Sequence, residues 1–151
     1  MRFKTVADVL HWVEGFHRQV QAELTGKWAE TGDERIRMLL AYLADHEQRL
    51  TAALEAYEED APATILFTWY RNADCPLAMD HDALSEAVSD MDIDEVLACV
   101  VRCHNSLIEL YETLRDRAEV PSVAEIFASL AAMEASELRR SVRDTNLLKD
   151  L

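Results

Sequence analysis

The residues best suited to chemistry are imidazoles and carboxylates that interrupt the apolar stripes of predicted helices. Glu47 stands between Leu43 and Leu50 in one such stripe, with His46 beside it. Three further stripes also carry titratable residues near their middles. These residues are His17 in the first stripe, His104 in the third, and Glu134 and Glu137 in the fourth. Because a buried carboxylate or imidazole without partners costs free energy, we expect these side chains to meet one another.

Helical geometry places these side chains on inward faces and at one level. At about 100° per residue, each of them lies within about 60° of the centre of its stripe. Glu14 lies at the edge of the first stripe, where its i,i+3 spacing gives it the same face as His17. Antiparallel helices would bring the four stripes' central residues into one layer. Carboxylates and imidazoles on facing helices of a bundle are ligands for two iron or manganese ions.

The helices that must position this layer can be delimited from caps and breaks. Thr5 with Asp8, and Ser122 with Glu125, have the spacing of capping boxes, and Pro62 and Pro121 interrupt the helical pattern. Four long helices are predicted, at about 6–25, 33–59, 93–118 and 123–145. The first two and the last two are separated by short links, which favours two helical hairpins. The connection at about 60–92 is long and contains short helical segments.

Length and composition favour one soluble all-α domain over residues 1–151. Gly and Pro are scarce, with three residues each, and half of the residues are hydrophobic. The formal net charge of −14 argues against binding to nucleic acid or to an anionic membrane, and it suits a basic protein partner or bound cations. The chain lacks an apolar run long enough to cross a membrane. Three cysteines, with no CxxC pair, are typical of a reducing cytoplasm.

The helix plan and the inward Glu/His layer resemble the ferritin-like superfamily, including its rubrerythrin-like branch. That family's pattern has a lone Glu on the first and third helices and Glu-x-x-His on the second and fourth. Here the Glu-x-x-His spacing falls on the first helix, and the order of ligand types is permuted. The segments that carry the resemblance are Glu14-Gly15-Phe16-His17, His46-Glu47, His104 and Glu134-Ala135-Ser136-Glu137. The resemblance implies an all-α four-helix bundle with a di-iron or di-manganese centre.

The same resemblance implies oxidoreductase chemistry, either iron oxidation, peroxide reduction or oxygen-dependent oxidation. The expected ligands are His17, Glu47, His104, Glu134 and Glu137, with Glu14 and His46 in supporting or alternative positions. We also expect a homodimer, because a short bundle commonly buries its remaining apolar surface against a second copy.

A second reading keeps the same fold without a metal. A buried, hydrogen-bonded His/Glu layer can fix the register of helices. The chain would then be a non-catalytic acidic bundle that binds a protein partner. Glu134 and Glu137 could also lie at a solvated helix edge, with Met133 facing inward.

Overall fold

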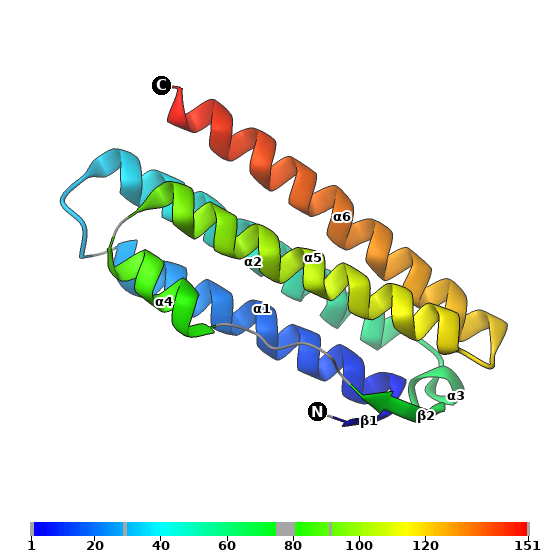
Figure 1. Cartoon of the computed structure of the whole chain (residues 1–151). Coiled ribbons are helices and arrows are strands. Elements are labelled where there is room, and N and C mark those ends of the chain that lie inside the picture. The colour runs from blue at the N-terminus through cyan, green and yellow to red at the C-terminus, as the bar shows by residue number, and fades with distance from the viewer. Residues whose placement is uncertain (1, 29, 75–80, 91, 151) are drawn as a thin grey trace.

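A computed structural model describes residues 2–28, 30–74, 81–90 and 92–150 (Figure 1). Most of these residues are helical, which confirms the predicted all-α class. In chain order, the elements are β1 (Arg2–Thr5), α1 (Val6–Trp28), α2 (Glu34–Asp60), α3 (Ala63–Leu66), β2 (Trp69–Asp74), α4 (His81–Ser89), α5 (Ile93–Arg117) and α6 (Pro121–Lys149). Cys75, one of the three cysteines, lies outside the described residues.

The four long helices form two packed pairs around one core. α1 packs along α2, α5 packs along α6, and the two pairs meet most extensively where α2 contacts α6 (Figure 1). The chain between the two pairs contains α3, β2 and α4, and α4 packs on both α5 and α1. The ferritin-like assignment stays a prediction. No helix in the described part of the chain is long and apolar enough to span a membrane.

Capping interactions explain where α1 and α2 begin. The backbone N–H of Asp8 donates to Thr5 Oγ1 at 3.2 Å, and the backbone N–H of Thr5 donates to Asp8 Oδ2 at 3.0 Å, which is a reciprocal capping box. Asp33 caps α2 by accepting from the backbone N–H groups of Arg35 and Ile36. These caps satisfy amides that have no partner within their own helix.

Two of the predicted helices are longer than expected. α1 continues to Trp28, past the predicted end at residue 25, because Gly26 stays helical and does not turn into the left-handed conformation. α6 spans 121–149 where 123–145 was predicted. Pro121 occupies its first turn, where a missing N–H costs nothing. At the other end of α6, Lys149 pairs with Asp94 of α5.

A small antiparallel ribbon replaces part of the expected helical connection. β2 pairs with β1, with Thr5 opposite Trp69 and Phe3 opposite Ala73. The backbone N–H of Val6 also donates to the carbonyl of Thr68 at 3.2 Å. Aromatic residues at 69 and 70 favour extended backbone. The ribbon ties the start of α1 to the connection.

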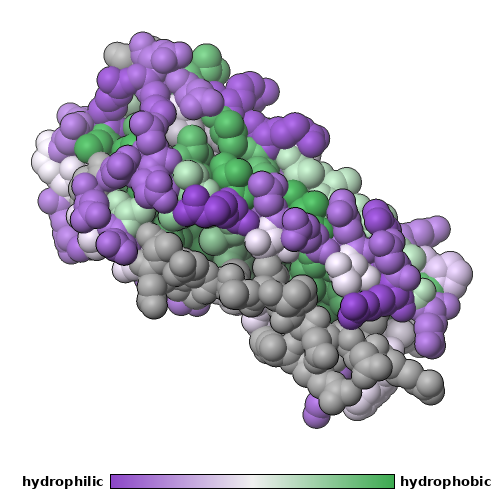
Figure 2. Space-filling model, in the orientation of Figure 1, coloured by the Kyte–Doolittle hydropathy of each residue, from purple (hydrophilic) through white to green (hydrophobic). Residues whose placement is uncertain are grey.

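The core is apolar above and below one polar layer. Leu43 and Leu50 on α2, and Leu107 on α5, are buried on either side of that layer. On the surface, hydrophobic residues also form a diagonal band over the face where α5 lies in front, with hydrophilic residues along its upper edge (Figure 2).

Candidate metal centre

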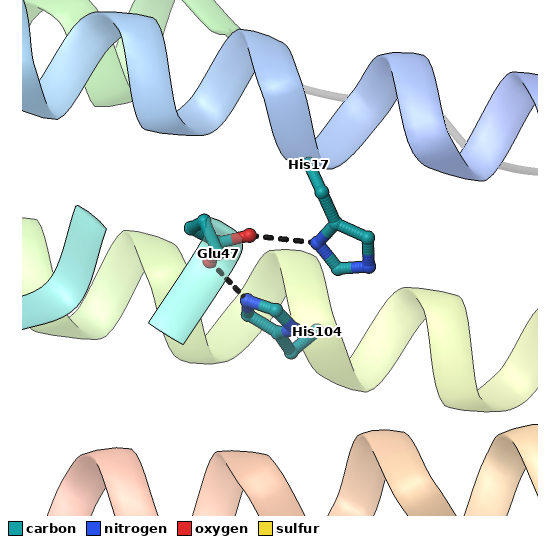
Figure 3. Close-up of side chains that lie close together, drawn as sticks. All are labelled: His17, Glu47 and His104. Atoms are coloured by element: carbon teal, nitrogen blue, oxygen red, sulfur yellow. Dashed lines mark hydrogen bonds and ion pairs between the residues drawn. The ribbon is translucent and has the colours of Figure 1, made fainter. Parts of the chain in front are cut away.

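Each of the four long helices contributes one residue to a buried polar cluster. These residues are His17 from α1, Glu47 from α2, His104 from α5 and Glu134 from α6, and we call them the His–Glu ring. Each is at most 3% exposed. Figure 3 shows Glu47 between the two imidazoles. The inward faces predicted from the helical period therefore meet at one level.

The contacts among the four ring residues form a closed cycle. Glu47 accepts from His17 Nδ1 through Oε2 at 2.7 Å and from His104 Nε2 through Oε1 at 2.6 Å (Figure 3). His104 Nδ1 bonds to Glu134 Oε1 at 2.5 Å. His17 Nε2 lies 3.4 Å from Glu134 Oε2, and neither atom has a hydrogen-bond partner among the described residues. Each imidazole thus lies between the two carboxylates, through three hydrogen bonds and one longer ion pair.

The ring's charges stabilise one another. Burial alone lowers the pKa of His17, but the Glu134 and Glu47 carboxylates outweigh it and raise that pKa to about 9. Burial has the same effect on His104, and the same two carboxylates raise its pKa well above the ordinary value. Burial raises the pKa of each carboxyl group, yet the imidazoles lower the pKa of Glu47 and Glu134 to about 2. The metal-free ring is therefore two carboxylates and two imidazolium groups, with no net charge.

Aromatic packing shields the two imidazoles. Their rings stack with centroids 5.3 Å apart and an interplanar angle of 29°. Phe16 contacts His17 edge-on at 5.2 Å and His104 at 6.3 Å. Low polarity around the ring strengthens its electrostatic interactions.

His46 and Glu137 lie outside the ring and contact each other between α2 and α6. We call them the outer pair. Arg140 Nη1 lies 3.5 Å from Glu137 Oε2, and Arg49 Nε lies 3.9 Å from Glu137 Oε1. Tyr42 packs edge-on against the His46 ring at 5.0 Å. One residue step turns a helix by about 100°, so His46 cannot face the same interface as Glu47.

Glu14 is also buried, at 5% exposure, but it faces the carboxylate of Glu58 on α2. Burial, followed by the Glu58 carboxylate, raises the pKa of Glu14 to about 7. The structure therefore brings four of the seven expected ligands into contact. Glu14, His46 and Glu137 form other contacts.

The ring has the donor set of a metal site. His17, Glu47 and His104 each offer one ligand atom, and these atoms lie within 4.8 Å of one another. Two imidazoles and one carboxylate are a common ligand set for zinc and for non-haem iron. If Nδ1 of His17 and Nε2 of His104 bind an ion, their other nitrogens face Glu134. A carboxylate in that position orients metal-binding histidines, so the residues fit an ion.

Sequence reasoning missed two neighbours of the ring, Phe16 and Tyr111. Tyr111 is fully buried and its hydroxyl has no hydrogen-bond partner in the described part of the chain. Its position seven residues after His104, on the same stripe, is the signal that would have identified it. No protein-family model, curated protein or solved structure matches this chain.

Proposed function

We propose that this chain is a ferritin-like metal-binding protein that holds a divalent transition-metal ion in the His–Glu ring. The observation that carries the proposal is the delivery of one imidazole or carboxylate from each long helix to a single buried contact. Two paired helical hairpins joined by a long connection also support the ferritin-like assignment.

Charge and ligand number favour one ion over the expected di-metal centre. With neutral imidazoles, Glu47 and Glu134 give the ring a charge of −2, which one divalent ion neutralises. Two divalent ions would need further carboxylates, and Glu14 and Glu137 are engaged with other groups. A second ion would therefore require both side chains to move.

Iron and manganese remain the metals we propose, with oxidoreductase activity as the consequence. A bound redox-active ion would supply one-electron chemistry. The chain's own part is to fix the two imidazoles and to exclude water. Because the ring residues are at most 3% exposed, only a very small molecule, such as oxygen or a peroxide, suits this site as a co-substrate.

The alternative is a structural network without metal, in an acidic bundle that binds a basic protein. One observation favours it: the ring already satisfies most of its polar atoms through its own hydrogen bonds. Such a network would fix the helix register. Homodimerisation and a cytoplasmic location stay predictions under either function.

Metal content separates the two functions. The protein is purified without chelator or immobilised nickel, equilibrated anaerobically with Fe²⁺ or Mn²⁺, desalted and analysed for metal. We expect one equivalent in the wild type. His17→Ala and Glu47→Ala should lose the ion, whereas His46→Ala should keep it, because the described contacts of His46 are with Glu137 and Tyr42.

Circular dichroism of all three variants controls for unfolding. A wild type that takes up no metal under these conditions would contradict the proposed function and leave the structural network. Equal loss of metal in His46→Ala would place the ion outside the ring.

A further inference from the structure

The His–Glu ring is enclosed, so an ion needs a path to it. Phe16 covers one side of both imidazoles, and the apolar side chains Leu43, Leu50 and Leu107 are buried on either side of the layer. Moving a hydrated divalent ion through apolar side chains is costly unless polar groups replace its water step by step. Buried polar side chains next to the ring are therefore the candidates for such a path.

Glu14 is the one buried carboxylate outside the ring among the described residues. It lies one helical turn from His17, and its Oε1 has no hydrogen-bond partner in the region that the structure describes. An unpartnered acceptor in a buried position is costly for a protein to maintain. A passing cation would supply the partner that this oxygen lacks.

Tyr111 lies on α5, seven residues after His104. The start of α1 and the end of α5 lie at the same end of the molecule (Figure 1), so Glu14 and Tyr111 are displaced from the ring in the same direction. Helical side chains lean toward the N-terminus of their helix, which brings the Tyr111 hydroxyl back toward the ring. Burial, and then the charges of Glu134 and Glu14, raise the pKa of that hydroxyl.

Glu58 provides the outer end of the path. Its side chain is 24% exposed and pairs with the surface residue His11, and it also acts on Glu14 across the contact between α1 and α2. From the surface inward, the polar groups are thus the partly exposed Glu58 carboxylate, the buried Glu14 carboxylate, the buried Tyr111 hydroxyl and the ring carboxylate of Glu134. The net charge of −14 also raises the local concentration of cations.

We propose that Glu58, Glu14 and Tyr111 form the access path by which a divalent cation reaches the His–Glu ring. This inference rests on the proposed function. Glu14 is then a transfer group and not a permanent ligand. A transfer group changes the loading and release rates by the same factor and leaves the dissociation constant unchanged, whereas a ligand changes the dissociation constant.

The experiment measures both rates with Co²⁺ as the probe. Metal-free full-length protein is mixed with Co²⁺ in a stopped-flow instrument, and visible absorption reports loading. Excess EDTA then reports release. We expect Glu14→Gln to slow loading and release on the order of tenfold each. Tyr111→Phe should also slow both rates, and by one common factor. Neither variant removes a residue of the ring.

Glu59→Gln is the matched control, because it removes an equal charge from an exposed residue of α2. It should load and release Co²⁺ as the wild type does. Unchanged rates in Glu14→Gln and Tyr111→Phe would overturn the path while leaving the metal site intact. Faster release with weaker binding in Glu14→Gln would also overturn it, because Glu14 would then be a ligand. No uptake by the wild type would overturn the proposed function and the path together.

Discussion

The His–Glu ring and the outer pair contain the same two residue types, yet their surroundings differ. In the ring, the side-chain polar contacts of each carboxylate among the described residues are with imidazoles, and every member is at most 3% exposed. In the outer pair, the Glu137 side chain is 14% exposed and has Arg140 and Arg49 within 4 Å in addition to His46. A carboxylate with solvent and arginines nearby can lose its histidine at little cost. In the part of the chain that the structure describes, neither solvent nor an arginine is placed to take the place of an imidazole beside a ring carboxylate.

The largest expected effect comes from breaking the ring on one side. Glu47→Ala leaves two buried imidazoles without a carboxylate that each of them contacts. We expect the metal-free protein to lose about 3–5 kcal/mol in its free energy of unfolding. Urea denaturation at pH 6 measures this loss. A loss below about 1 kcal/mol would mean that the ring is not the buried charged network described here.

The next effect concerns pH, and it applies to the metal-free protein. Folding raises the pKa of His17 from 6.5 to about 9, so its contribution to stability is complete below pH 6.5 and is lost as the pH rises through 9. The loss is on the order of 3 kcal/mol. Folding lowers the pKa of Glu47 and Glu134 from 4.5 to about 2, so their contribution is complete above pH 4.5 and is lost as the pH falls through 2.

Stability of the metal-free wild type should therefore be greatest near pH 4.5 and fall above it, because the raised pKa of Glu14 also removes stability as the pH rises from 4.5 to about 7. Urea titrations from pH 4 to 9.5 test this profile. A free energy of unfolding that stays constant or rises between pH 6.5 and 9 would contradict the charge state assigned to the ring.

A smaller effect follows from replacing the whole ring at once. A variant with His17→Leu, Glu47→Leu, His104→Leu and Glu134→Leu removes all four polar side chains together. Apolar replacement of a complete buried ionic network is often neutral or stabilising, so this variant should unfold at higher urea concentration than Glu47→Ala. It should bind no metal and lose the fall in stability between about pH 7 and 9 that the His17 imidazole causes. If this variant is as unstable as the Glu47→Ala variant, the polar ring is required for a stable bundle.

The smallest effect is expected at the outer pair. Glu137→Ala should lower the free energy of unfolding by about 1–3 kcal/mol, less than Glu47→Ala, because it leaves one buried imidazole, that of His46, without its carboxylate. Metal content should not change. Denaturation in parallel with Glu47→Ala makes the comparison direct, and equal losses in the two variants would remove the distinction between ring and outer pair.

The sequence predicted which helix faces turn inward better than it predicted which side chains meet. The period of the apolar stripes was enough to place His17, Glu47 and His104 on the core side. It did not separate Glu134 from Glu137, because both lie close to the centre of the α6 stripe. The rotation of α6 against its neighbours decides between them, and that rotation depends on packing with three other helices.

Features that depend on contacts between segments far apart in the chain also could not be predicted from the sequence. The β1–β2 ribbon pairs residues 2–5 with residues 69–74, and two short segments so far apart in the sequence give no local sign that they pair. The Glu14–Glu58 contact joins α1 to α2, so the i,i+3 spacing of Glu14 and His17 suggested a shared site that the structure does not form.

Anomalous diffraction from crystals of the protein loaded with Mn²⁺ would locate the ion. We expect one anomalous peak at coordination distance from His17 Nδ1, Glu47 and His104 Nε2, with Glu134 behind the two imidazoles. Two peaks in the core would contradict the single-ion assignment. A loaded crystal with no peak at the ring would contradict the metal centre itself.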